Sequence, residues 1–196
     1  MRGWPEPSSP IFFGGIDPGE LAPLMVEAAK RWCVAFCAME QLGAYQAATG
    51  PAWVRAGVWV KPNSAPQFSG DRPAQAAEGV AIMHRKGKKT WNGGGSRAAW
   101  FNPRPVTGKS GHPTEKPVKL MMDLICSFTD PDDLILDPFA GSGATGVAAL
   151  RAGRRVCLIE KDPVWAAHCQ DRMRSEAAGV DMQRSHPAQL AMGFDR

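Results

Sequence analysis

The sequence predicts an α/β protein with a doubly wound sheet, on three observations. Two short apolar runs, residues 134–136 and 156–159, are typical of buried parallel strands. An acid follows each run, Asp137 after the first and Glu160 after the second. A glycine-rich turn at 141–146 then leads from the first run into a helical pattern. Ligands of open α/β sheets bind at such turns, outside the carboxyl ends of the strands.

The elements before this turn alternate between helical and extended patterns. Asp17 and Pro18 predict a helix start, with Asp17 as the N-cap, and the helix continues to about Arg31. An unbroken apolar run at 33–37 is typical of a buried parallel strand. A further helix is expected at 41–48, followed by strands at 53–61 and 79–84.

After these strands, Thr114 is a candidate N-cap for a helix at 117–128. Its apolar face is predicted from helical spacing to contain Val118, Met121, Ile125 and Phe128. The last helix is expected from Val164 to about Arg174, and residues 176–196 as a C-terminal tail.

Composition limits the class of protein. The length of 196 residues suits one domain, and no apolar run approaches the ~20 residues of a membrane span. The start of the chain does not have the apolar core of a signal peptide. Five cysteines, an odd number, lie in apolar or helical stretches, which indicates reduced thiols in a cytoplasmic protein. We expect no membrane partner, and the sequence contains no cluster of metal ligands.

The turn at 141–146 is compatible with two ligand chemistries. It matches the G-x-G-x-x-G pattern of dinucleotide-binding proteins, and Glu160 follows about twenty residues later, where a ribose hydroxyl would bind. However, the carboxylate of Asp137 would repel a pyrophosphate and would instead favour an ammonium group. S-adenosylmethionine (SAM) carries an ammonium, a sulfonium and a ribose, but no phosphate. A helix N-terminus packed on a sheet without any ligand is the structural alternative.

A basic segment lies between the strand at 79–84 and the helix at 117–128. Its cations greatly outnumber its acids, and Trp91, Trp100 and Phe101 are interleaved with them. Cations in loops neutralise phosphates, and aromatic side chains in loops stack on bases, so this composition favours double-stranded DNA over a solvated surface loop. The candidate DNA contacts are Arg85, Lys86, Lys88, Lys89, Arg97 and Arg104.

Three motifs in a fixed order carry a resemblance to a known family. They are His-Pro-Thr-Glu-Lys-Pro at 112–117, Asp-Pro-Phe-Ala-Gly-Ser-Gly at 137–143 and Ile-Glu-Lys-Asp-Pro at 159–163. In this combination the chain closely resembles the C-terminal half of the β-class SAM-dependent DNA amino-methyltransferases, which methylate N6 of adenine or N4 of cytosine. A weaker likeness through Trp-Val-Lys-Pro-Asn at 59–63 extends over most of the chain.

The resemblance implies a Rossmann-like methyltransferase fold in the permuted β-class order. Residues 1–175 would form one domain, in which 1–84 belong to the catalytic half, 85–111 to the target-recognition segment and 112–175 to the SAM-binding half. It implies the DNA methylation of a restriction-modification system, with SAM as the cofactor. The implied SAM-binding residues are His112, Thr114, Glu115, Lys116, Asp137, Pro138, Phe139, Gly141, Ser142, Gly143, Glu160 and Lys161.

The chain departs from the family at the catalytic motif. The family's Asp/Asn/Ser-Pro-Pro-aromatic tetrapeptide, which lies before the other motifs, is not found in the sequence, and Asp17-Pro18-Gly19-Glu20 is the nearest substitute. The missing segment would also supply a central strand beside 134–136. Three readings follow: the protein starts upstream of Met1, the chain is a truncated remnant, or a second copy or another subunit completes it. The functional alternatives are an active DNA methyltransferase, an inactive DNA-binding remnant or subunit, and an NAD-dependent oxidoreductase.

Overall fold

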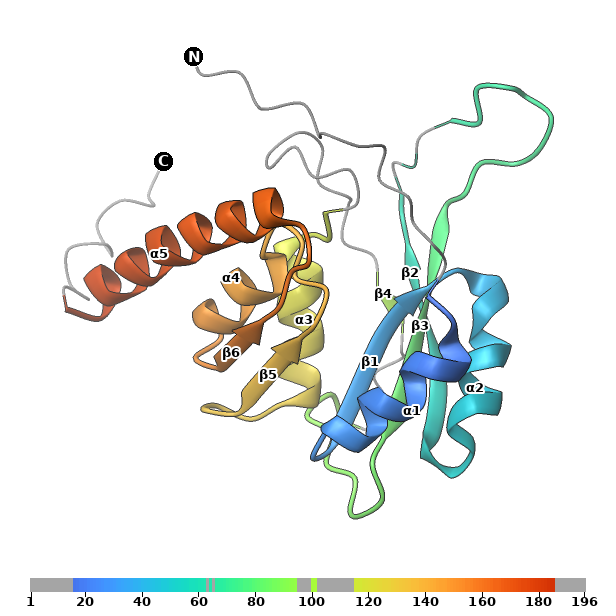
Figure 1. Cartoon of the computed structure of the whole chain (residues 1–196), viewed down its shortest axis with the longest axis horizontal. Coiled ribbons are helices and arrows are strands. Elements are labelled where there is room, and N and C mark those ends of the chain that lie inside the picture. The colour runs from blue at the N-terminus through green and yellow to red at the C-terminus, as the bar shows by residue number, and fades with distance from the viewer. Residues whose placement is uncertain (1–15, 63, 65, 95–99, 102–114, 186–196) are drawn as a thin grey trace. The chain divides into compact units, whose positions relative to one another are not determined.

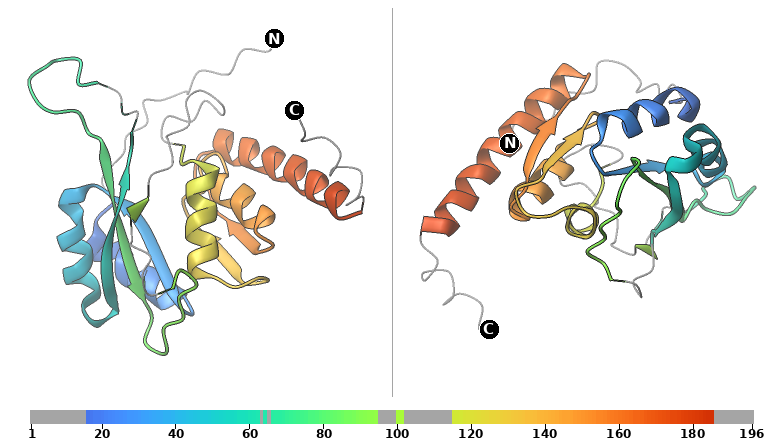
Figure 2. Two further views of the ribbon diagram at one scale, coloured as in Figure 1. Left: turned by 180° about the vertical axis from the view of Figure 1, so that it is seen from behind. Right: turned by 90° about the horizontal axis from the view of Figure 1, so that it is seen from below.

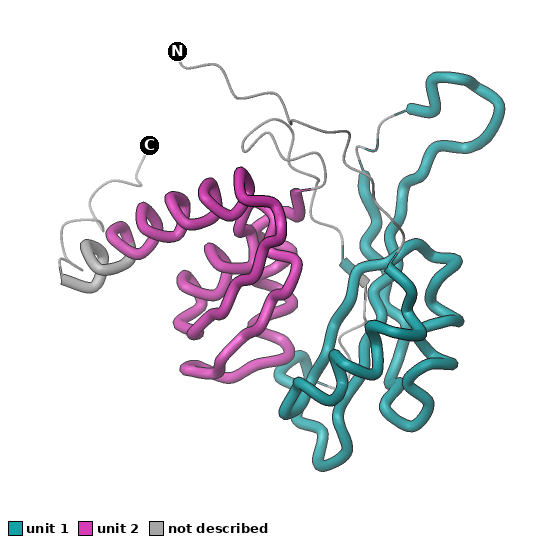
Figure 3. Tube along the Cα trace, viewed as in Figure 1, with its two compact units in different colours: residues 1–104 teal, residues 105–196 magenta. Residues whose placement is uncertain are grey.

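The computed structural model describes residues 16–62, 64, 66–94, 100–101 and 115–185, with no account of side chains 180–185. The chain divides into two compact units, Met1–Arg104 and Pro105–Arg196 (Figure 3). Each unit has its own sheet and its own helices (Figure 1). Within the described ranges, no helix is long and apolar enough to cross a membrane.

A four-stranded sheet forms the centre of the first unit. Its strands are β1 (Trp32–Cys37), β2 (Trp53–Val60), β3 (Ala77–His84) and β4 (Trp100–Phe101), in the spatial order β1-β3-β2-β4. Strand β3 is antiparallel to both β1 and β2, whereas β4 is parallel to β2. The prediction of a parallel strand at 33–37 was therefore wrong. Alternate residues of β1 are fully buried, and the residues between them are half-buried. Both faces of this antiparallel strand are therefore at least partly covered, which accounts for the unbroken apolar run.

The helices of the first unit are α1 (Pro18–Ala28) and α2 (Leu42–Thr49), with short 3₁₀ turns η1 (Met39–Gln41) and η2 (Gly50–Ala52) beside α2. The predicted N-cap is confirmed, because the backbone N–H of Gly19 donates to Oδ1 of Asp17 at 2.8 Å. Helix α1 ends earlier than the expected Arg31, since Ala29 already has extended backbone angles.

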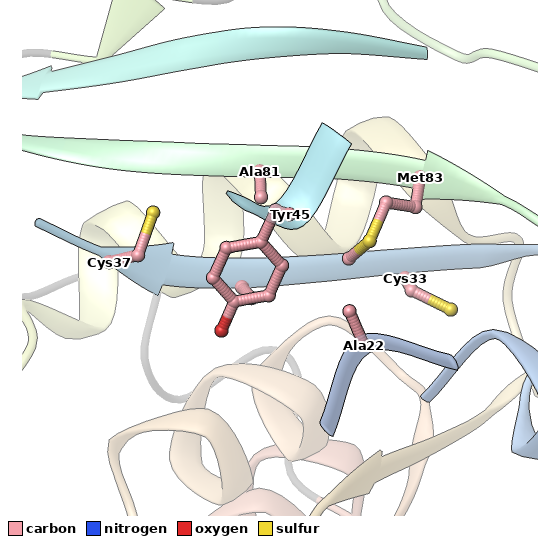
Figure 4. Packing of buried hydrophobic residues seen from close by; sticks show 7 residues of the cluster. Ala22, Cys33, Cys37, Tyr45, Ala81 and Met83 are labelled. Carbon is pink, nitrogen blue, oxygen red and sulfur yellow. The ribbon is translucent and has the colours of Figure 1, made fainter. Parts of the chain in front are cut away.

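Both helices pack on one face of this sheet. Figure 4 shows Ala22 of α1 and Tyr45 of α2 in one apolar cluster with Cys33 and Cys37 of β1 and Met83 of β3. Burial raises the pKa of the Cys33 thiol to about 11, so it stays protonated at neutral pH. All five cysteines are free thiols, as the sequence predicted.

The second unit contains a two-stranded parallel sheet of β5 (Leu134–Asp137) and β6 (Arg155–Leu158). Helices α3 (Val118–Phe128) and α4 (Ala144–Arg151) cover one face of this sheet. The left view of Figure 2 shows these helices from behind. Ile125 of α3 meets Ala148 and Ala149 of α4, and Ile135 of β5 packs against them. The buried face of α3 includes the predicted Ile125 and Phe128, and also Leu120 and Leu124, which the spacing analysis omitted.

The last helix, α5 (Pro163–Ser185), is longer than predicted. The sequence suggested an end near Arg174 and a tail from residue 176. Instead, the guanidinium of Arg151 on α4 forms two hydrogen bonds with the carboxylate of Glu176, at 2.5 and 2.9 Å. This pair attaches the second half of α5 to α4, and the helix continues past Gly179, a residue that helices tolerate at modest cost.

The other face of the β5–β6 sheet is apolar and exposed. Leu134 and Leu136 are 61% and 50% exposed, and Cys157 of β6 and Ile159 after it are exposed as well. Among the described strands, β5 pairs only with β6. The sheet predicted from the sequence is thus present as two separate sheets in the described residues, and the strand expected beside 134–136 is not among them.

Candidate ligand-binding site

Two carboxylates lie at the same edge of the β5–β6 sheet. Asp137 is the last residue of β5 and pairs in register with Leu158, the last residue of β6, two positions before Glu160. Because the strands are parallel, their carboxyl ends meet at one edge. Asp137 and Glu160 are both half-buried. The structure therefore brings together the two acids that the sequence predicted for the site.

The glycine turn between β5 and α4 has a backbone that favours glycine. Gly141 has φ of 50° and Gly143 has φ of 84°, which is the left-handed region that side chains other than glycine rarely adopt. A Cβ added at Gly143 would also lie 2.8 Å from Sγ of Cys169 on α5. The N–H of Ala140 donates to the carbonyl of Ile159 at 3.0 Å, which holds the turn against the end of β6.

Local hydrogen bonds orient both carboxylates. Oε2 of Glu160 accepts from the backbone N–H of Gly141 at 2.7 Å, and Oε1 accepts from Asp162 at 2.9 Å. Oδ1 of Asp137 accepts from the N–H of Phe139 at 3.0 Å, and Oδ2 accepts from the hydroxyl of Thr145 at 2.5 Å. A carboxylate offers about four lone-pair positions. Each acid therefore keeps acceptor capacity for a ligand that donates hydrogen bonds.

The charges of the site act on the Cys169 thiol, which lies behind the turn. Burial raises the pKa of the Cys169 thiol behind the turn, and the charges of Asp137 and Glu160 raise it further, while Arg172 acts in the opposite direction. An uncompensated pair of carboxylates disfavours an anionic ligand and favours a cationic one.

Arg172 on α5 provides a cation behind the turn. Its Nη1 donates to Oε1 of Glu115 at 2.7 Å and to the carbonyl of Ser142 at 3.0 Å, with Oγ of Ser142 at 3.3 Å. The side chain of Glu115 is only 5% exposed, and that of Arg172 is 26% exposed. Of the predicted site residues, Glu115 and Ser142 therefore contact Arg172, and a direct role for them toward a ligand stays a prediction.

The other predicted residues vary in their placement. Phe139 is 55% exposed beside Asp137, Pro138 is half-buried, and Lys161 is exposed next to Glu160. Lys116 is half-buried just before α3. His112 and Thr114 lie outside the described residues, so their predicted roles are not addressed by the structure.

The first part of the basic segment is anchored at both ends. The N–H of Arg85 donates to the carbonyl of Arg31 at 2.7 Å, and Nε1 of Trp32 donates to the carbonyl of Thr90 at 2.7 Å. Arg85 also directs Nη1 at the carbonyl of Ala29, at 3.3 Å. Between these anchors the side chains of Lys86, Lys88 and Lys89 are exposed. The predicted Arg97 and Arg104 lie outside the described residues.

The sequence analysis missed two residues of this site. Thr145 donates a hydrogen bond to Asp137. The sequence feature that could have indicated this role is its position in the first turn of the helix that follows the glycines. Arg172 follows Cys169 by three positions and precedes Met173, and both of these neighbours pack on the glycines of α4. Helical spacing places Cys169, Arg172 and Met173 on one face of α5 but does not indicate that this face lies against the turn.

Comparison with known proteins identifies the family of this chain. A family model described as DNA methylase, for N6 and N4 methylation, matches residues 53–171, which is more than half of the chain. The chain belongs to this DNA methylase family. The matched region includes the glycine turn, both carboxylates and the whole basic segment, and this confirms the resemblance found in the motifs.

Two curated relatives support the assignment. A methylase of Escherichia coli (strain K12), YubD, is 59% identical over 54 residues, which are 28% of this chain and 24% of that protein. The type II methyltransferase M.XycI of Xanthomonas campestris pv. cyanopsidis is 34% identical over 137 residues, covering 63% of this chain and 45% of that protein. The chain thus spans less than half the length of either relative.

Solved structures of DNA methyltransferases have the same fold. The M1.HpyAVI–SAM complex superimposes with a TM-score of 0.62 at 28% identity, covering 72% of this chain and 74% of that one. The cytosine-N4-specific PvuII DNA methyltransferase matches with a TM-score of 0.52 at 20% identity, covering 64% and 56%, and shows the fold alone. The α/β methyltransferase fold predicted from the sequence is confirmed.

Proposed function

We propose that this DNA methylase uses SAM to methylate the exocyclic amino group of adenine or cytosine in double-stranded DNA, in the cytoplasm. The observation that carries the proposal is the pair Asp137 and Glu160, which flank a glycine turn at the carboxyl ends of two parallel strands. A membership in the DNA methylase family and a similarity to a protein solved with SAM support the same ligand.

The chemistry of these residues fits SAM. Glu160 has free lone pairs for the two ribose hydroxyls, and Asp137 has them for a donor group such as the ammonium. The carboxylate of Asp137 disfavours the pyrophosphate of NADH beside the turn, because like charges at close range repel. SAM supplies an electrophilic methyl group, and the residues of this chain bind it and orient it.

DNA would reach the enzyme through the basic segment, residues 85–111. Its exposed lysines are suited to phosphates. The target base has to leave the duplex, since its amino group is hydrogen-bonded inside the stack. In the family, the catalytic tetrapeptide then accepts the amino hydrogens and stacks an aromatic ring on the base. This tetrapeptide does not occur among residues 1–196, so we assign no catalytic residue in this chain.

Asp17-Pro18, the substitute for that tetrapeptide considered in the sequence analysis, is a helix cap. The carboxylate of Asp17 is bonded to the N–H of Gly19 and is followed directly by α1. This role accounts for both residues without any catalytic function.

We infer that a further segment carries the catalytic motif and adds a strand at the free edge of β5. The exposure of Leu134 and Leu136 supports this further segment, because the apolar residues of a central strand are normally covered. The segment would belong to a longer form of the chain or to another subunit. A second candidate function, an inactive DNA-binding remnant or subunit, is favoured by the same missing motif.

Two measurements separate these functions. Calorimetry with SAM and NADH tests the cofactor, and we expect SAM to bind and NADH not to bind. Binding of NADH in preference to SAM would contradict the methyltransferase proposal. Transfer of a radiolabelled methyl group to DNA then distinguishes an active enzyme from a remnant.

A further inference from the structure

Helix α5 packs directly on the back of the glycine turn. Cys169, Arg172 and Met173 lie at positions i, i+3 and i+4, on one face of the helix. Cys169 and Met173 fill the space that a side chain would need at Gly143 and Gly146. Arg172 stands between these two contacts and is the charged residue of the three.

Arg172 connects three segments that are distant in the sequence. It belongs to α5, Ser142 belongs to the glycine turn, and Glu115 precedes α3. A single nitrogen, Nη1, bonds both the carboxylate of Glu115 and the carbonyl of Ser142. The Glu115 side chain and Ser142 are almost fully buried, so both bonds are largely shielded from water.

The link to the ligand runs through one residue of the turn. Ser142 follows Gly141, whose N–H binds Glu160, and precedes Gly143, whose N–H binds the carbonyl of Ala140 at 2.8 Å. Fixing the peptide that joins Ser142 to Gly143 therefore fixes the turn from behind. A mobile turn would release Glu160 from Gly141 and change the direction of its carboxylate.

We propose that Arg172 is a positioning residue for the cofactor: it holds the glycine turn against Glu115 so that the turn and Glu160 keep the geometry that binds SAM. The proposal rests on the proposed function for the identity of the ligand. It assigns Arg172 no contact with SAM, and it extends the site from the two strands to α3 and α5.

The test compares Arg172→Met with Arg151→Met in the 196-residue chain. Arg151 is a matched control, because it also pairs with a glutamate across α4 and α5 but lies away from the turn. SAM affinity is measured by calorimetry well below the melting temperature of each variant. Hydrogen–deuterium exchange of residues 138–146 reports on the turn itself and needs no ligand.

We expect Arg172→Met to weaken SAM binding by about tenfold or more, since it removes the cation that bonds both Glu115 and the carbonyl of Ser142. Exchange in 138–146 should rise in this variant alone, and Arg151→Met should bind SAM within about twofold of wild type. An Arg172→Met protein that is folded and shows unchanged affinity and unchanged exchange would overturn the proposal. A loss of melting temperature in both variants with unchanged SAM affinity would show a purely structural role.

Arg172→Lys covers the case in which the methionine variant does not fold. Lysine keeps the charge but has a shorter reach and no planar fork, so SAM affinity should fall by about three- to tenfold, with a smaller rise in exchange. Wild-type values for both quantities in this variant would count against the proposal. If wild type itself does not bind SAM, the proposed cofactor is wrong, while the exchange measurement still decides whether Arg172 holds the turn.

Discussion

Thr145, in the first turn of α4, donates its hydroxyl hydrogen to Oδ2 of Asp137, at the end of β5, over 2.5 Å. The other oxygen of Asp137 accepts from the N–H of Phe139. The carboxylate is thereby held at the N-terminal end of a helix, where the partial positive charge of the helix favours an anion. Strand, turn and helix therefore fix the direction of this acid before any ligand arrives.

Replacing either acid of the site should weaken SAM binding. Asp137→Ala and Glu160→Ala should each reduce affinity by roughly 1.5–3 kcal/mol, because each removes a charged hydrogen-bond partner. Thr145→Val should have a smaller effect in the same direction, since it frees the Asp137 carboxylate without removing it. Calorimetry measures all three.

Asp171→Asn serves as the control for these variants. Asp171 is an exposed acid of α5 that pairs with Arg174, three residues along the same helix. Its loss should leave the affinity for SAM unchanged. Equal losses in the Asp171 and Asp137 variants would mean that general charge, and not the site, governs binding.

DNA binding should depend on the exposed lysines of the basic segment. Changing Lys86, Lys88 and Lys89 together to glutamine should weaken binding to duplex DNA and flatten its dependence on salt, because fewer counterions are released. Adding Arg85→Gln, to give the quadruple variant, tests a cation that also contacts Ala29. Fluorescence anisotropy at several salt concentrations measures the slope.

A matched triple variant controls for net charge. Arg72, Lys119 and Arg174 are exposed cations that each have an acidic partner, namely Asp71, Asp123 and Asp171. Their replacement should change the salt slope much less. If the lysine variant and wild type have the same salt dependence of DNA binding, the DNA contacts lie elsewhere on the protein.

The pair between α4 and α5 should make stability depend on pH. Hydrogen bonds from Arg151 hold the pKa of Glu176 below its ordinary value of 4.5. A carboxyl with a lowered pKa in the folded state adds stability above about pH 4.5, and this stability is lost as the pH falls through the lowered pKa. Glu176→Gln should therefore be less stable than wild type at pH 7, and the difference should shrink below pH 4.5. Urea unfolding of both proteins at pH 7 and below pH 4.5 checks this. A difference in unfolding free energy that does not change with pH would contradict it.

The sequence predicted local features well and long-range ones poorly. The cap at Asp17 and the strand at 79–84 were predicted because each depends on residues close in the chain. Asp137 and Glu160 were expected at one edge of a sheet because each follows an apolar run, and the parallel pairing of β5 and β6 brings them together, while their role toward a ligand stays a prediction. The orientation of β1 depends on pairing with β3, more than forty residues away, and an apolar run alone does not distinguish parallel from antiparallel partners. Arg172 was missed because its partner Glu115 is 57 residues away.

The end of the last helix was missed for a related reason. Gly179 and the polar residues around it give a weak helical pattern on their own. The contact that holds this part of α5 is the bond from Glu176 to Arg151, 25 residues earlier in the chain. The exposed face of β5 was not predicted either, although the sequence analysis did predict that a strand beside it was missing from the chain.

Finally, we expect residues 1–196 alone to transfer no methyl group to DNA, even under conditions where they bind SAM. The complete Asp/Asn/Ser-Pro-Pro-aromatic tetrapeptide, which would accept the amino hydrogens of a flipped base and stack on its ring, does not occur in residues 1–196. An upstream extension with Asp-Pro-Pro and an aromatic should restore activity. It should also raise the melting temperature, because covering Leu134 and Leu136 buries apolar surface worth about 1–3 kcal/mol for each leucine, and each kcal/mol corresponds to about 2–4 °C.

A radiolabelled methyl-transfer assay and thermal unfolding of the two proteins test this expectation together. The two gains should appear in the same protein, since one segment provides both the motif and the strand. If an extension with the Asp of this motif changed to Ala stabilises the chain but does not activate it, the strand and the chemistry are separable as proposed. Robust transfer by the 196-residue chain would refute this account. Asp17→Ala would then show whether the cap of α1 has a catalytic role, by abolishing transfer while SAM binding persists.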